Sequence, residues 1–486
     1  QTCSSDLALA APTFNQDVAP ILHQNCATCH RPGEVAPFPL LTYSDAAKRA
    51  SLIALVTEKR FMPPWKPEPG VGKFTHERRL TDEQIRTLKE WSAAGAPEGE
   101  GRAPEPPKFP DGWQLGTPDR VFQMPVEFEV PADGPDRFEC FVIPTELAGE
   151  MYMGAAEFRP GNPRVVHHAL VMLDTSGRAR QMARANGGSH YPCFGGAQIP
   201  VAGLVFGWAP GSVSPPAEPG ISRKLEKGTD IVVQLHYHPS GKVERDRSSL
   251  GFYWSGPPSK GVATVIMLNT NLYIPAGSAE TRVKSSMTMP QDGELFAIAP
   301  HAHYLGKEMK VDAHLPDGSV TPLLWIKDWD FNWQGSYHYA DPVRLPQGTV
   351  VKLDAYYDNS ENNPQNPSSP PKLVRWGEQT TDEMCLLGLQ LTADSIGDLR
   401  KITSMPGGVL GTALFGGIPI DEANPPKYDN VKLPAEGVPI PDRFRAVLGL
   451  YDRDRNNRLT QDEVERMPER MRNRVLEFVG GLLPDE

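Results

Sequence analysis

The hexapeptide Asn-Cys-Ala-Thr-Cys-His at residues 25–30 constrains the fold of this chain more than any other feature. The pattern Cys-x-x-Cys-His is the attachment motif of c-type haem. In such a site Cys26 and Cys29 form thioether bonds to the porphyrin, and His30 supplies one axial ligand to the iron. A redox or zinc-binding Cys-x-x-Cys is the alternative, but no second Cys-x-x-Cys completes a zinc site and no βαβ pattern surrounds this one. The sequence therefore predicts a covalently bound haem c.

Helical patterns lie on both sides of this motif. Apolar residues recur at helical spacing before it, at Phe14, Val18, Ile21 and Leu22. After it, the segment 81–97 predicts a second helix, with Thr81 as its N-cap and glycine and proline at its end. Two helices that bracket Cys-x-x-Cys-His resemble a small all-α cytochrome c domain, which we place at residues 14–98.

The second axial ligand of a haem in this domain is expected to follow the motif. Met62 lies in the proline-fixed sequence Arg-Phe-Met-Pro-Pro-Trp, and a thioether ligand raises the haem potential, which suits electron transfer. Met62 is therefore the predicted ligand. His76 is the alternative ligand, and Met62 then serves only in packing.

The rest of the chain favours β structure in several domains. With 486 residues the chain is too long for one core. Its 50 prolines, about twice the average share, and its many short Val/Ile/Tyr runs favour turn-rich antiparallel sheets. We therefore expect a Pro/Gly/Glu-rich linker at 99–117 and two antiparallel, jelly-roll-like β-sandwich domains at 118–257 and 258–425.

Charge and hydropathy exclude two classes of partner. A formal net charge of -11 without a Lys/Arg stripe disfavours binding to nucleic acid, and no run of about twenty apolar residues predicts a membrane span. The chain starts at Gln1 rather than Met, which suggests a processed start from which a signal peptide was removed. We expect a periplasmic or secreted location.

Histidines recur in strand-like, apolar segments of the two β domains. They are the adjacent pair His167 and His168, the group His236 and His238 two residues after Gln234, and the pair His301 and His303. Two histidines spaced i, i+2 on a strand leave the same surface and can chelate one metal. A thioether such as that of Met384 selects copper over zinc or iron. Taken singly, each of these residues is also compatible with packing or an ordinary surface position.

The order of these motifs resembles the copper type II, ascorbate-dependent monooxygenases, the family of peptidylglycine α-hydroxylating monooxygenase and dopamine β-monooxygenase. His-His, Gln-x-His-Tyr, His-x-His before Leu-Gly-Lys, and Asp-Glu-Met-Cys occur in family order across residues 118–395. The resemblance implies an electron-transfer copper held by His167, His168 and His236. It implies a second copper, where O₂ and substrate meet, held by the catalytic residues His301, His303 and Met384. Both vicinal histidines reach one copper only if their strand is twisted or bulged.

The resemblance also bears on the remaining cysteines and polar residues. It implies a disulfide between Cys140 and Cys193, whereas the state of Cys3 and Cys385 stays open. Gln234 matches the glutamine next to the family's first site. His238 has no family counterpart, and it could compete as a ligand or support the ligands from behind.

The chain departs from the peptide-amidating members where those bind a peptide carboxylate. An Arg two residues before His-x-His, with Asn and Tyr after the Met, is replaced here by Ala299, Leu386 and Gly388. Without the guanidinium fork a carboxylate has no obvious anchor. We therefore expect a less polar substrate with an activated C–H bond.

The C-terminal region, residues 440–482, is predicted to be a helix-loop-helix with an EF-hand-like loop. Calcium-loop positions 1, 3, 5, 7, 9 and 12 fall on Asp452, Asp454, Asn456, Arg458, Thr460 and Glu463. Asn457 replaces the usual turn glycine and tolerates the left-handed conformation. Three arginines in the loop oppose a dication, so the alternative to a calcium site is a structural hairpin with a vestigial loop.

These observations predict a copper-dependent monooxygenase with two coppers, a covalent haem c and a calcium-loop candidate. It would hydroxylate a C–H bond of a small organic substrate with O₂, and an external donor would supply electrons through the haem. A tethered haem donor works at high effective concentration. The alternative is a non-catalytic haem and copper electron-transfer or copper-handling protein. The substrate and the oligomeric state do not follow from the sequence.

Overall fold

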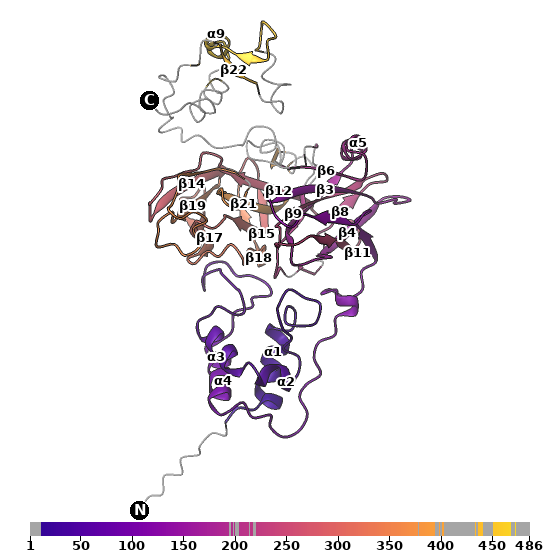
Figure 1. The fold of residues 1–486 in the computed structure, drawn as a ribbon, viewed down its shortest axis with the longest axis vertical. Coiled ribbons are helices and arrows are strands. Elements are labelled where there is room, and N and C mark those ends of the chain that lie inside the picture. Colours follow the sequence, from indigo (N-terminus) through magenta and orange to yellow (C-terminus); the bar gives the residue numbers. More distant parts are fainter. Residues whose placement is uncertain are drawn as a thin grey trace, which may run out of the picture. The chain divides into compact units, whose positions relative to one another are not determined.

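The computed structural model describes residues 11–193, 196–197, 199, 204–212, 214–216, 220–377, 379–393, 398, 401–402, 433, 436–440, 451–467 and 472. The chain divides into two compact units, residues 1–419 and 420–486. The described part is mostly β-sheet with few helices (Figure 1). A membrane-spanning helix is not found among the described residues, because none combines the required length with an apolar composition.

The N-terminal region is helical and has its own core. Its elements are η1 (Phe14–Val18), α1 (Ala19–Asn25), α2 (Tyr43–Ala47), α3 (Ala50–Glu58) and α4 (Asp82–Ala93). Phe14, Leu22, Leu88 and Trp91 are buried together at its centre. The predicted cap of the last helix is confirmed, because Thr81 and Gln84 form a reciprocal capping box at the start of α4.

Two antiparallel sheets, which we call the first sandwich, follow this helical region. One sheet has the order β1-β11-β4-β8 and the other the order β6-β3-β9-β5-β7. Their bounds are β1 (Arg120–Gln123), β3 (Arg137–Pro144), β4 (Met151–Arg159), β5 (Val166–Asp174), β6 (His190–Pro192), β7 (Leu204–Trp208), β8 (Arg223–Leu225), β9 (Asp230–Tyr237) and β11 (Ser249–Trp254). Phe122 and Phe252 of one sheet share a core with Phe141, Val171 and Val233 of the other. A short ribbon of β2 (Phe128–Val130) and β10 (Glu244–Asp246) and the helix α5 (Arg178–Ala185) complete this part.

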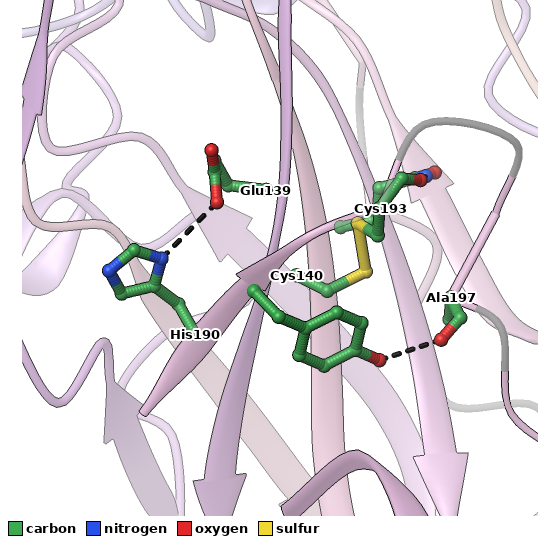
Figure 2. The surroundings of a disulfide bond; sticks show 7 residues. Glu139, Cys140, His190, Cys193 and Ala197 are labelled. Atoms are coloured by element: carbon green, nitrogen blue, oxygen red, sulfur yellow. Dashed lines mark hydrogen bonds and ion pairs between the residues drawn. A yellow bond between two sulfur atoms is a disulfide. The ribbon is translucent and has the colours of Figure 1, made fainter. Parts of the chain in front are cut away.

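The predicted disulfide between Cys140 and Cys193 is confirmed in the first sandwich (Figure 2). It ties β3 to the segment that follows β6, and both cysteines are fully buried. On one side of it, His190 Nδ1 lies 3.2 Å from a carboxylate oxygen of Glu139. Cys385 is buried and not in a disulfide, and Cys3 lies outside the described residues.

A second pair of four-stranded sheets, which we call the second sandwich, has the orders β12-β21-β15-β18 and β14-β19-β16-β17. Its strands are β12 (Gly261–Leu268), β14 (Thr281–Thr288), β15 (Gly293–His301), β16 (Gly306–His314), β17 (Val320–Ile326), β18 (Tyr337–Leu345), β19 (Val350–Tyr357) and β21 (Leu386–Ala393). All pairings are antiparallel, and a two-stranded ribbon joins β13 (Tyr273–Ile274) to β20 (Val374–Arg375). Val265, Leu295, Leu353 and Leu389 are buried between the sheets, so the architecture is consistent with the expected pair of β-sandwiches.

The loop after α3 joins the helical region to the second sandwich. Phe74 is buried in the core of that sandwich and forms a bridge with Tyr339 of β18. The Ala340 N–H donates to the Lys73 carbonyl at 2.7 Å, and the Thr75 N–H donates to the His338 carbonyl at 2.7 Å. The helical region is therefore held by main-chain bonds and core packing, in addition to the linker.

The predicted linker is itself packed against its neighbours. Asn15 donates from its amide to the carbonyls of Gly99 and Gly101 at 3.1 and 3.0 Å. The short turn η2 (Pro110–Gly112) accepts a hydrogen bond from Arg31 at the Gly112 carbonyl, 2.8 Å away. The linker thus holds a defined path rather than acting as a free tether.

The C-terminal unit is described in part. It contains β22 (Val438–Pro439), which pairs antiparallel with β23 (Arg458–Leu459), followed by α9 (Gln461–Glu465). The helix predicted before the loop lies outside the described residues.

Candidate metal centres

The first histidine cluster is built by the two central strands of the five-stranded sheet. His168 of β5 pairs with His236 of β9, and the register shifts between Val166 and His168. His167 is therefore the extra residue of a β-bulge, so it does not simply point to the opposite face of the sheet. The bulge expected from the vicinal histidines is present.

The three imidazoles of this cluster converge through the same ring atom. Nδ1 of His168 lies 3.3 Å from Nδ1 of His167 and 3.2 Å from Nδ1 of His236. Tetrahedral nitrogen ligands about 2.0 Å from a metal are about 3.3 Å apart, so the spacing fits a metal ion. Burial, with a smaller effect of His236, lowers the pKa of His167 to about 3 and that of His168 well below its usual value. Both rings are therefore neutral at pH 7 and offer lone pairs to a metal.

A carboxylate that was not singled out from the sequence supports this cluster from behind. One oxygen of Asp136 lies 2.9 Å from Nε2 of His236, and the other lies 2.8 Å from Nδ1 of His238. Burial alone would raise the pKa of Asp136, but hydrogen bonds from these histidines and from Thr380 lower it well below its usual value. The carboxylate therefore lies beside Nε2 of His236, on the side of the ring away from the Nδ1 atom that faces His168.

His238 and Gln234, the two other polar residues of this strand region, have separate partners. The His238 side chain is 63% exposed and faces Asp136, so it lies behind the ligands rather than among them. Gln234 donates from Nε2 to the Cys193 carbonyl at 3.0 Å. Gln234 thus anchors the disulfide-bonded segment to β9.

The second cluster lies where β15 ends. His301 is the last residue of β15 and pairs with Leu386 of β21. Continuing this antiparallel register beyond the strands brings Met384 opposite His303. The imidazole centroids of His301 and His303 are 5.1 Å apart. The register therefore brings the main chain near Met384 beside the two histidines, and its thioether stays a predicted ligand.

Both histidines of the second cluster are held by Nδ1. Nδ1 of His301 donates to the side-chain oxygen of Gln334, and Nδ1 of His303 lies 3.1 Å from the Asp382 carbonyl. These acceptors leave both Nε2 atoms free. Burial lowers the pKa of His301 to about 4 and that of His303 to about 3, so both rings are neutral. Two neutral imidazoles with free Nε2 atoms fit copper, and the Met384 thioether is the predicted third ligand.

Glu383 is a functional residue that the sequence analysis did not single out. Its buried carboxylate accepts hydrogen bonds from the N–H groups of His303, of Leu305 at 3.0 Å and of Met384 at 2.7 Å. Burial raises the pKa of Glu383 to about 8. The carboxylate therefore ties the His-x-His turn to the methionine. In the sequence, only its position directly before Met384 pointed to a role for Glu383.

The haem motif lies at the end of α1. Cys26 and Cys29 are unpaired, and burial raises the pKa of Cys26 to about 12. Nδ1 of His30 lies 3.0 Å from the Phe38 carbonyl, which leaves Nε2 free for iron. Two free thiols and one oriented imidazole fit the attachment of haem c. Met62, half-buried after α3, and the exposed His76 stay predictions for the second axial position.

The EF-hand-like loop brings three of its six predicted ligands together. Carboxylates of Asp452, Asp454 and Glu463 offer oxygen atoms that all lie within 4.8 Å of one another. Asn457 has the expected left-handed conformation, with φ of 63°. At the remaining positions, the side chains of Asn456 and Thr460 hydrogen-bond to carboxylates of the loop itself. The guanidinium of Arg458 donates to the carbonyls of Glu436 and Gly437, each at 2.6 Å. The positive charge of Arg458 therefore faces carbonyl oxygens of the two residues just before β22.

Comparisons with known proteins agree with the second cluster. Residues 261–389 match the family model described as the C-terminal domain of copper type II ascorbate-dependent monooxygenases. This segment contains His301, His303 and Met384 and supports a copper monooxygenase, an oxidoreductase that uses O₂ and a small-molecule substrate. A search of curated proteins returned no match.

Solved structures show only remote likeness. The major capsid protein P2 of bacteriophage PM2 is 8% identical with a TM-score of 0.24, covering 56% of this chain and 97% of that one. A structure of infectious bursal disease virus, Gx strain, is 7% identical with a TM-score of 0.18, covering 57% and 72%. A structure of PNGF-II is 8% identical with a TM-score of 0.19, covering 56% and 60%. These likenesses are too weak to bear on the fold or the function.

Proposed function

We propose that this chain is a haem-linked copper monooxygenase that hydroxylates a C–H bond of a small organic substrate. The observation that carries the proposal is the pair of unlike donor sets in one compact unit. One set brings three imidazoles together through Nδ1, and the other offers two imidazoles through Nε2, with Met384 as the proposed third ligand. Copper bound there would cycle between Cu(II) and Cu(I) at the first set and activate O₂ at the second.

The chain's own residues prepare each donor set for that role. Asp136 lies against Nε2 of His236 and adds negative charge behind the first set, which supports an oxidised metal ion. Gln334 and the Asp382 carbonyl fix the tautomers of the second set without adding charge. Neutral support and a thioether favour the reduced ion that reacts with O₂.

The surface beside the second set favours an apolar substrate. Ala299 pairs with Gly388 and His301 pairs with Leu386, so the positions that bind a carboxylate in peptide-amidating relatives are small or apolar here. A Cβ atom at Gly388 would meet the Ala299 side chain at 3.5 Å, so these two paired positions present only a methyl group and a hydrogen. We infer a substrate that lacks a carboxylate near its reacting C–H bond.

The helical region is proposed to be a cytochrome c domain that delivers electrons to the first set. Cys29 lines a cleft with Glu34, Arg159, Trp208 and Gly211, so a haem attached there would lie beside the first sandwich. Trp208 pairs with Ala169, the residue after His168. The Arg159 and Glu34 side chains form an ion pair at 2.9 Å across the same boundary. Fixed, close placement suits electron transfer without a separate docking step.

The location, the electron donor and the calcium loop complete the proposal. A periplasmic or secreted location agrees with the formed disulfide and with haem c. An external donor would reduce the haem, and no nucleic acid is needed as a partner. The clustered carboxylates of the C-terminal loop would hold Ca²⁺.

The test combines metal analysis with isotope incorporation. Purified protein should contain about two coppers and one iron per chain. After turnover under ¹⁸O₂ with a panel of small apolar substrates, mass spectrometry should find one labelled oxygen in the product. Two coppers, reductant-dependent redox cycling and no labelled product with any substrate would favour a non-catalytic electron-transfer or copper-handling protein instead.

The haem relay has its own test. Reduced haem should be reoxidised on mixing with Cu(II)-loaded protein, and slowly or not at all in copper-free protein. Equal rates in both preparations would contradict the relay while leaving the hydroxylase proposal intact.

A further inference from the structure

One aromatic ring lies between the two histidine clusters. The ring of Phe331, in the loop between β17 and β18, stacks on His167 with centroids 4.8 Å apart and an angle of 20° between planes. The same ring meets His303 edge-on, with centroids 5.5 Å apart. These two distances bound the separation of the His167 and His303 centroids at about 10 Å. The side chain is 3% exposed, so this interposed ring is enclosed.

A second contact joins the two sites independently. Thr380, four residues before Met384, donates from its hydroxyl to Asp136 at 3.0 Å. Asp136 is the carboxylate that supports His236. The loop that leads to Met384 therefore also bonds to the carboxylate that supports the first set.

The loop around Phe331 is fixed from several sides. Asp330 accepts hydrogen bonds from the N–H and the side-chain amide of Asn332 at 3.0 and 3.1 Å. Gln334 donates to the Phe331 carbonyl at 2.9 Å while accepting from His301. Tyr304 packs on the Phe331 ring with centroids 4.5 Å apart. A ring that is held this way can set the distance between the two surfaces it touches.

We propose that Phe331 is a positioning residue that holds the two ligand sets face to face at a fixed, short separation. The inference rests on the proposed function, because it takes both sets as copper sites. The ring fills the space between His167 and His303, so it excludes water there and fixes how closely the two sandwiches approach. Thr380 secures the same closed arrangement through Asp136.

Magnetic coupling between two Cu(II) ions measures this separation directly. In protein loaded with Cu(II) at both sites, continuous-wave and pulsed EPR should show a strong dipolar interaction with a narrow distance distribution. In Phe331→Ala, at unchanged copper content, the distance distribution should broaden about twofold or more and the coupling should depart from the wild-type value, because the packing that fixes the separation is gone. Phe331→Leu, which keeps part of the volume, should give an intermediate result.

Controls separate positioning from general loss of structure. Phe296→Leu alters a buried phenylalanine of β15 that contacts His338 instead, and it should leave the coupling unchanged. Thr380→Val should broaden the distribution less than Phe331→Ala does. Two coppers per chain with the wild-type coupling retained in both Phe331 variants would overturn the positioning role alone. Failure of wild-type protein to bind two coppers would instead contradict the proposed function.

Discussion

The two histidine clusters use the same side chain in opposite ways. In the first, a bulge at the start of β5, beside the end of β9, brings three Nδ1 atoms together, and His236 is supported from behind by the carboxylate of Asp136. In the second, a strand end presents two Nε2 atoms, supported by the side-chain amide of Gln334 and the Asp382 carbonyl. The acceptor behind each ring decides which nitrogen faces the metal and how much charge that ligand carries.

The two clusters also differ in how the backbone holds them. The first is set by paired strands, with β9 buried along its whole length. The second extends past the last strand pair, so its geometry depends on Glu383, which gathers three N–H groups. A site built at a strand end can keep coordination positions open, but it needs a separate residue to hold its shape. The two designs should therefore respond differently when a ligand or its support is replaced.

Removing the thioether should break only the second cluster. Met384→Ala is expected to lower hydroxylation by more than about 100-fold, because loss of a ligand exceeds the 10- to 100-fold effects of supporting residues. Product formation and the EPR spectrum of the first site measure the two clusters separately, and the first site should be unchanged. Met287→Ala, which truncates a buried methionine of β14, is the control. Full activity in Met384→Ala would mean that this methionine only fills the core.

Removing the carboxylate of Glu383 should destabilise the second sandwich. Glu383→Ala leaves three buried N–H groups without an acceptor, at a cost of about 3 kcal/mol or more in the free energy of unfolding. Glu383→Gln keeps one acceptor oxygen and should cost less. Chemical denaturation measures both, with Glu280→Ala at an exposed position as a control that should stay within about 0.5 kcal/mol of wild type. Equal stability of Glu383→Ala and this control would contradict the role of the carboxylate.

Neutralising the support of the first cluster should affect copper affinity there. Asp136→Asn keeps the size of the side chain but removes its charge, and we expect Cu(II) binding at the first site to weaken about 10- to 100-fold. Competition with a chelator, followed by EPR, measures the affinity of each site. The affinity of the second site should change little. An equal loss at both sites would indicate a disturbed interface between the sandwiches rather than a local effect.

The bulge and the paired His-x-His side chains could be expected from the sequence because they depend on local spacing, whereas the grouping of the histidines and Met384 into two ligand sets came from the family resemblance. An adjacent histidine pair on a strand demands a bulge if both rings bind one metal, and His-x-His on a strand end shares one face. The capping box at Thr81 is local in the same way, since its two partners are three residues apart. The disulfide pairing came from resemblance rather than from spacing.

The supporting residues could not be predicted because they come from distant parts of the chain. Gln334 is 33 residues from His301, and Asp136 approaches His236 from the loop before β3. Their sequence surroundings are those of ordinary polar loops. The insertion of Phe74 into the second sandwich was also missed, because a single aromatic residue in a Gly- and Lys-containing loop shows no periodicity. Such contacts are set by tertiary packing, which local patterns do not encode.

The smallest predicted effect tests whether charge behind a ligand is what separates the two clusters. Gln334→Glu places a carboxylate behind His301 and so gives the second cluster the support that Asp136 gives the first. The ligand becomes a stronger donor, and Cu(II) affinity at the second site should rise about tenfold relative to Cu(I) affinity. Gln334→Ala removes the acceptor and should lower affinity for both ions by about tenfold, because the His301 ring loses its fixed orientation. Paired Cu(I) and Cu(II) competition titrations distinguish these outcomes. If Gln334→Glu leaves the ratio of Cu(II) to Cu(I) affinity at the second site unchanged, the difference between the clusters lies in the thioether and the open strand end. The charge behind the imidazole is then incidental.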